Sequence, residues 1–102
     1  MTGTYLLRIN IPPSLEEEFI DTLLDNPLVE GYQCYSTSGH GQVGAMSVTE
    51  QVAGRRSRVQ FEVVLDAESV DAVLDGLKSA LPISDIVYWL MPITASGRFS
   101  DP

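Results

Sequence analysis

Apolar and polar residues alternate along several segments of the chain. Residues 4–11 read TYLLRINI and residues 58–65 read RVQFEVVL. Every second side chain in both segments is apolar, which is the pattern of a β-strand with one buried face. Residues 31–38, GYQCYSTS, alternate more weakly, and residues 85–93, DIVYWLMPI, are apolar on both faces. We therefore expect four strands, of which the last is covered on both sides.

Two other segments repeat apolar residues at helical spacing. The first runs from Leu15 to Leu24 and follows Ser14, which has the spacing of a capping box with Glu17. The second carries apolar residues between positions 70 and 81, after Asp66 as a favourable N-cap. We expect helices at both places, the first beginning at Ser14, so the order of elements is βαββαβ.

This order predicts an α+β, ferredoxin-like fold: a four-stranded antiparallel sheet with two helices on one face. The length of 102 residues predicts one domain, 1–102, with a flexible tail from about residue 95. The sheet face without helices would carry several apolar side chains, namely Leu6, Tyr35, Val64, Trp89 and Met91. An uncovered apolar face is typical of an interface, so we expect a homo-oligomer.

Composition excludes several classes of partner. The formal net charge of −8 argues against nucleic-acid binding, because phosphates repel such a surface. No apolar run is long enough for direct membrane insertion. The single cysteine, Cys34, has no partner for a disulfide within the chain, which together with the lack of a signal-like segment indicates a cytoplasmic protein.

The connector between the second and third predicted strands concentrates the unusual residues. It contains SGHG at 38–41, with Gly39, Gly41 and the only histidine, His40. Imidazole binds zinc, copper or nickel, and Glu50 or Cys34 could add ligands if several subunits meet. The alternative is a loop histidine that makes local hydrogen bonds and a cysteine that packs as a small hydrophobe. Because no nucleophile–base pair accompanies His40, we expect no enzymatic activity.

Basic residues also gather at the end of this connector. Arg55, Arg56 and Arg58 are three of only six basic residues, and Arg98 follows in the tail. The cluster could bind an anion such as phosphate, a nucleotide or an acidic protein surface. It could equally be solvated or form salt bridges with a neighbouring subunit.

Two ferredoxin-like classes fit the sequence poorly. An RNA-recognition domain would carry several aromatic residues flanked by basic ones on its third strand, whereas RVQFEVVL has one aromatic. An acylphosphatase would need a phosphate-binding loop after the first strand, where this chain has NIPPSLEEE with three carboxylates.

A third class fits. The segments SGHG at 38–41 and EQVAGRRSRVQFEV, which begins at Glu50, resemble the PII-like family of small trimeric regulators, and more narrowly a PII-like group known as a domain of unknown function. The similarity extends from LLRINIPPSLEEEFIDTLL to YWLMPI. It implies a homotrimer and a signalling loop over about residues 39–57. Members of the narrower group resemble proteins encoded near heavy-metal efflux systems, which implies a membrane transporter or another protein as partner.

The resemblance also bears on the ligand. Nucleotide-binding PII proteins carry a glycine- and lysine-rich loop after the second helix, whereas Leu81 to Asp85, LPISD, has neither glycine nor basic residue. This favours a divalent metal, copper or a small anion over an adenine nucleotide.

The resulting hypothesis is a non-enzymatic sensor. A ligand at the subunit cleft would order the 39–57 loop and change its affinity for a partner. The anion ligands would be Gly39, Gly41, Arg55, Arg56, Arg58 and Arg98, and the metal ligands His40, Glu50 and Cys34. The alternatives are a metal-binding protein linked to heavy-metal tolerance and a protein-interaction module that needs no ligand.

Overall fold

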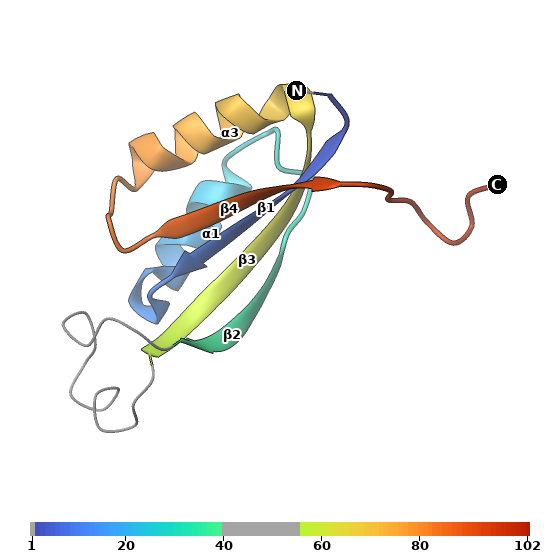
Figure 1. The fold of residues 1–102 in the computed structure, drawn as a ribbon. Coiled ribbons are helices and arrows are strands. Elements are labelled where there is room, and N and C mark those ends of the chain that lie inside the picture. The colour runs from blue at the N-terminus through green and yellow to red at the C-terminus, as the bar shows by residue number, and fades with distance from the viewer. Residues whose placement is uncertain (1, 40–55) are drawn as a thin grey trace.

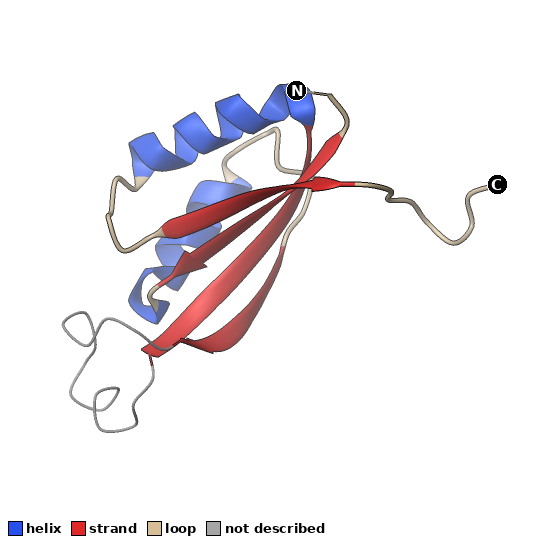
Figure 2. Ribbon diagram, viewed as in Figure 1, coloured by secondary structure: helices blue, strands red, loops and turns tan. Residues whose placement is uncertain are grey.

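The fold is a βαββαβ sandwich of one sheet and one layer of helices, as the sequence predicts. The computed structural model describes residues 2–39 and 56–102, with the side chains of the second range from Ser57 onward. The elements are β1 (Thr4–Ile11), η1 (Pro13–Leu15), α1 (Glu16–Leu24), β2 (Gln33–Gly39), β3 (Arg56–Asp66), α3 (Ala67–Ala80) and β4 (Val87–Ile93). Figure 1 shows both helices on the same side of the sheet, and Figure 2 shows the same layers by type of element.

The sheet is antiparallel throughout and has the order β2-β3-β1-β4. β1 and β3 are therefore central, and β2 and β4 form the edges. One end of the sheet, which we call the loop end, has Gly39 opposite Arg56 and Asn10 opposite Val87. At the other end, the tail end, Thr4 lies opposite both Asp66 and Ile93.

The core lies between the sheet and the two helices. Its strand residues are the alternating apolar positions Leu7, Ile9, Ile11, Val59, Phe61, Val63 and Leu65. Helix α1 contributes Phe19 and Leu23, and α3 contributes Val70, Val73 and Leu77. Phe61 is fully buried, with its ring 4.8 Å from that of Phe19 and 5.7 Å from that of Tyr32. Burial of these side chains is the main free-energy term that holds the helices on one face.

The start of the first helix differs from the prediction. A 3-10 turn occupies Pro13–Leu15, α1 begins at Glu16, and no side chain caps either element. The backbone N–H of Leu15 donates to the carbonyl of Pro12 at 3.1 Å, so the turn starts before Ser14. Ser14 consequently lies inside a turn rather than at its N-cap, and the expected capping box does not form. Asp66 does occupy the N-cap of α3, without a side-chain cap bond.

The last strand is less covered than its sequence predicts. β4 pairs only with β1, and its Val87, Tyr88 and Trp89 are exposed in the single chain. Beyond it, residues 94–102 form no helix or strand and extend away from the body (Figure 1). No helix within residues 2–39 and 56–102 is long and apolar enough to cross a membrane.

Candidate functional site

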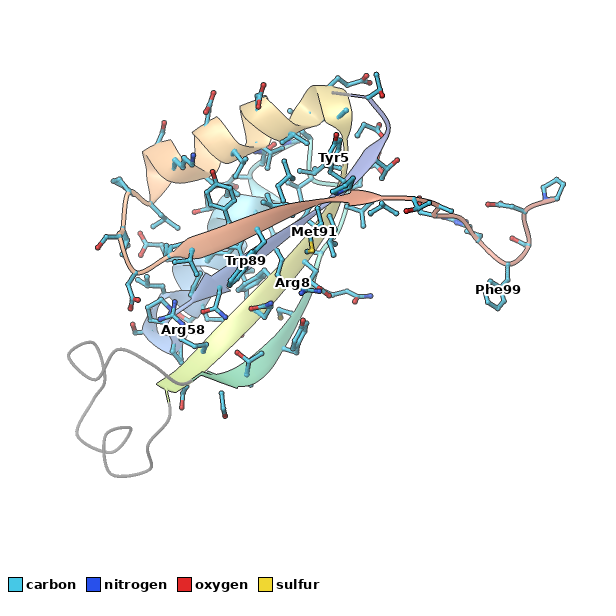
Figure 3. The ribbon with its side chains drawn as sticks, in the orientation of Figure 1. Tyr5, Arg8, Arg58, Trp89, Met91 and Phe99 are labelled. Carbon is cyan, nitrogen blue, oxygen red and sulfur yellow. The ribbon has the colours of Figure 1, made fainter. Side chains whose placement is uncertain are left out.

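The helix-free face of the sheet carries a large share of the exposed apolar side chains. The strand register places on it Leu6, Tyr35, Val64, Val87, Trp89 and Met91, which include all five that the sequence predicts there. Tyr35, Val64 and Trp89 retain 44%, 55% and 51% exposure. Figure 3 shows Trp89 and Met91 beside Arg8 over the middle of the sheet. A face of this kind, apolar and without cover in the chain itself, is typical of a contact surface.

Two polar pairs lie between these apolar residues, on the central strands. Arg8 donates from Nε and Nη2 to Oε2 of Glu62 at 2.9 and 2.7 Å, and the two side chains are 35% and 19% exposed. Asn10 donates from Nδ2 to Oε1 of Gln60 at 2.7 Å. Each pair joins residues directly opposite on β1 and β3. Because the groups are already paired within the chain, a partner surface could cover them without leaving an uncompensated charge.

Arg58 lies at the loop end of the same face and is the only buried charged residue among those described. Its guanidinium donates to the side-chain oxygen and the carbonyl of Asn10, and to the carboxylate and the carbonyl of Asp85. The contact to the Asp85 carboxylate is 3.1 Å and that to its carbonyl 2.6 Å. We call this set of three residues the Arg58 clamp. It ties β3 to the end of β1 and to the turn that leads into β4.

The clamp changes the interpretation of the basic cluster. Four hydrogen bonds occupy most of the five N–H groups of Arg58, whose side chain is 5% exposed. The segment LPISD also brings the carboxylate of Asp85 to this position, where it neutralises the guanidinium. Arg58 therefore has a structural role within the chain. Its role in an anion site stays a prediction, because an anion would have to replace some of these hydrogen bonds to Asn10 and Asp85.

A shallow groove of about 320 Å³ lies beside the clamp at the loop end. Its lining includes Glu16 from α1 and the hydroxyl residues Ser36, Thr37, Ser38 and Ser57 from β2 and β3. These hydroxyls both donate and accept, so the groove suits a small polar ligand better than an apolar one. It lies where β2 ends at Gly39 and β3 begins at Arg56.

Gly39 and Cys34, two further predicted ligands, belong to β2. Gly39 ends the strand beside Arg58, and an added Cβ would lie 3.9 Å from Cγ of that residue, so ordinary packing alone would tolerate alanine there. Cys34 is exposed and lies opposite Phe61 on the helix side of the sheet. In the part of the chain that the structure describes, no group of three or more His, Cys, Asp or Glu side chains could hold a metal ion.

The remaining predicted ligands lie away from the Arg58 clamp and its neighbouring groove, or fall outside the described residues. Arg98 lies in the tail, beyond the end of the sheet opposite to the clamp, so one chain does not bring it to Arg58 (Figures 1 and 3). Arg56 is described as the first residue of β3 without its side chain. Gly41, His40, Glu50 and Arg55 lie outside the described residues, so their roles stay predictions.

The hydrogen-bond partners of Arg8 and Arg58 on the sheet face were not predicted from the sequence. Asn10 and Asp85 are 48 and 27 residues away from Arg58, and Glu62 is 54 residues from Arg8. The only local signal was that Arg8, Asn10, Gln60 and Glu62 occupy the polar positions of strongly alternating strands. That pattern gives the face on which they lie but not their opposite neighbours.

The arrangement of one helix layer on a four-stranded β2-β3-β1-β4 sheet, with an uncovered second face, is the ferredoxin-like class of fold. Solved structures show that PII proteins share this fold. The crystal structure of Arabidopsis thaliana PII bound to citrate aligns with a TM-score of 0.70 and 15% identity over 90% of this chain and 78% of the other. A Bacillus cereus protein related to NIF3 aligns with a TM-score of 0.68 and 16% identity over 95% of this chain and 27% of the other.

Within this class the chain belongs to the DUF3240 family, described as proteins of unknown function, whose model matches residues 1–100. A DUF3240 family protein from Shewanella baltica OS155 aligns with a TM-score of 0.78 and 23% identity, over 98% of this chain and all of the other. No match was found among curated proteins. The resemblance stated from the sequence is thereby confirmed for family and fold.

Proposed function

We propose that the protein is a homotrimeric, non-enzymatic regulator of the PII-like type, assembled through the helix-free face of its sheet. The observation that carries this proposal is that face: exposed apolar side chains surround polar groups that are already paired within the chain. A face with unpaired charges would resist burial, and a fully polar face would gain little from it. Here the charges in the middle of the face, Arg8 and Glu62, are paired within the chain, and the exposed carboxylate of Asp66 lies at the tail-end edge of the face.

The proposed regulatory element is the 39–57 loop, although its first residue, Gly39, belongs to β2 and its last two, Arg56 and Ser57, belong to β3. Gly39 and Arg56 are directly opposite on these two strands. The Arg58 clamp fixes β3 two residues after Arg56. The strands at the base of the loop would therefore keep their positions when a ligand changes the conformation of the loop. A ligand with different affinity for two states of this loop would change the surface offered to a protein partner.

The proposed ligand is a small anion or a metal ion, bound where subunits meet. One observation supports a site beyond the single chain. Arg98 lies at the opposite end of the sheet from Arg58, so one chain does not bring these two predicted anion ligands together. A subunit cleft would bring together residues that one chain keeps apart, including His40 and Glu50 for a metal.

The test is native mass spectrometry of the protein alone and with zinc, copper, nickel and adenine nucleotides in turn. The proposal predicts a trimer that gains one ligand per subunit or one per threefold axis. His40→Ala should abolish a metal adduct but leave an anion adduct intact. A trimer that ignores every addition would refute the sensor and favour a ligand-independent interaction module, while a monomer would refute the subunit cleft.

The role of the helix-free face is tested separately with Trp89→Ser. Removing this half-exposed indole should shift the trimer to monomer at micromolar concentration, because the lost apolar contact recurs in every subunit. Leu24→Ser on α1 is the matched control, since Leu24 is 69% exposed and lies outside the face. If both variants assemble like the wild type, the helix-free face is not the interface.

A further inference from the structure

The tail carries an aromatic residue that nothing in the described chain covers. Phe99 is fully exposed, whereas Phe19 and Phe61 are buried in the core. A phenylalanine ring has a large apolar area, so its burial against another surface would be favourable. Figure 3 shows Phe99 far from the body, on the segment that follows β4.

The tail presents this ring on a formed turn. The N–H of Asp101 donates to the carbonyl of Arg98 at 3.0 Å, and the N–H of Arg98 donates to the Asp101 carboxylate at 2.8 Å. These bonds close a four-residue β-turn with Arg98 first and Phe99 second. Because the turn is already hydrogen-bonded, Arg98 and Phe99 would lose less conformational entropy on binding than in a disordered peptide.

A groove of about 730 Å³ lies at the tail end of the sheet. We call it the tail-end groove. Leu6, Leu28 and Val64 contribute apolar surface to a lining that is about half polar, and Glu30 and Asp66 contribute exposed carboxylates. Leu28 and Val64 are 43% and 55% exposed, so an aromatic ring could pack against them.

From these features we infer that the tail of one subunit docks in the tail-end groove of a neighbouring copy, with Phe99 against Leu28 and Val64 and Arg98 beside the carboxylates. Charge complementarity supports this occupant: Arg98 is the one basic residue of the tail, and Glu30 and Asp66 are acidic. Continuity supports it too, because Leu6 and Val64 belong both to the groove and to the helix-free face. The inference deepens the proposed function, since it rests on assembly through that face.

The chain's own groove is a less suitable place for its tail. Ser96 already lines the groove, so the segment passes its rim, yet Phe99 three residues later remains fully exposed. The turn from Arg98 to Asp101 begins two residues after Ser96. A neighbouring groove avoids the sharp reversal that insertion into the same chain would require.

Cross-linking between two different chains tests this placement. One chain carries Leu28→Cys and the other Ser100→Cys, both with Cys34→Ser, and the chains are mixed, allowed to exchange subunits and oxidised. This design leaves Arg98 and Phe99 in place. The inference predicts a disulfide between positions 28 and 100 of different chains, identified by peptide mass spectrometry. Leu24→Cys in place of Leu28→Cys is the control and should not form it. Absence of the 28–100 bond in the mixture would overturn the inference.

Affinity provides a second measurement that does not depend on cysteine geometry. Phe99→Ala should raise the concentration at which the oligomer dissociates by roughly 10- to 100-fold, as expected for exposing one aromatic side chain. Phe99→Tyr should retain the wild-type value. Arg98→Glu should weaken assembly, and Glu30→Lys in the same chain should restore it. Unchanged dissociation in Phe99→Ala would refute the docking.

These outcomes are distinguishable from failure of the proposed function. If Trp89→Ser leaves the oligomer intact, the assembly face is wrong whatever the tail does. If Trp89→Ser dissociates the oligomer, Phe99→Ala leaves dissociation unchanged and the 28–100 cross-link does not form, the assembly face stands and the tail inference alone is wrong.

Discussion

Replacing Arg58 with methionine tests whether the clamp holds the sheet together at the loop end. Methionine keeps the length and the apolar stem of the side chain but removes the charge and all four hydrogen bonds. The carbonyls of Asn10 and Asp85 then lose their donor. We expect the native state to be destabilised and the end of β1 to separate from the turn before β4.

The magnitude follows from burial. A buried hydrogen-bond acceptor that loses its donor lowers the free energy of unfolding by about 1–3 kcal/mol, and breaking a fully buried ion pair lowers it by about 3–5 kcal/mol. The side chain of Asp85 is 39% exposed, so water would replace part of what Arg58 gives it. We therefore expect Arg58→Met to lower the free energy of unfolding by about 2–4 kcal/mol.

Urea unfolding at one fixed protein concentration measures this change, because assembly makes stability depend on concentration. Lys78→Met is the matched control. Lys78 is exposed, donates to the Tyr88 hydroxyl at 3.2 Å and lies 4.9 Å from its ring centre, so its loss should cost about 1 kcal/mol or less. Equal losses in the two variants would refute the structural role that we assign to Arg58. Combining Arg58→Met with Asp85→Asn should cost less than the sum of the single changes.

Three further predictions concern single positions. Phe61→Ala should lower the free energy of unfolding by about 3–5 kcal/mol in the same urea assay, because a fully buried ring that contacts Phe19 is lost; a loss below that of Lys78→Met would contradict the packing described. Gly76→Ala, inside α3, should stabilise the protein by about 0.5–1 kcal/mol, because an added Cβ would lie 3.7 Å from Nδ2 of Asn26, which is ordinary contact; destabilisation would show that the helices approach more closely there. Cys34 is exposed, so it should react with a thiol reagent in the native protein. If zinc slows this reaction, the predicted role of Cys34 as a metal ligand is supported; a rate that zinc does not change would argue against it.

The fold was predictable because its strands alternate so clearly. Val59, Phe61, Val63 and Leu65 reach the core together with their partners on β1, and the same alternation placed Leu6 and Trp89 on the opposite face. Successive side chains of a strand point to opposite faces of the sheet, so one buried residue determines the face on which every other residue of that strand lies. Strand order then followed from the crossover rules.

The local start of the first helix was not predictable from the capping pattern. Ser14 and Glu17 have the right spacing, but the carbonyl of Pro12 accepts the first turn bond and shifts the start of the turn ahead of Ser14. The candidate site was less predictable still. Arg58 stood out by composition as an anion ligand, while its true neighbours Asn10 and Asp85 come from strand pairing and a distant turn. No sequence window contains that information.

The position of β1 in the sheet also constrains the order in which the protein can be made. β1 is synthesised before its two partners, β3 and β4, which begin at Arg56 and Val87. Until those strands leave the ribosome, β1 has no partner and its apolar face stays open to water or to chaperones. The centre of the sheet therefore closes only after β4 has been made, and folding depends on contacts between distant parts of the chain, which are slow to form.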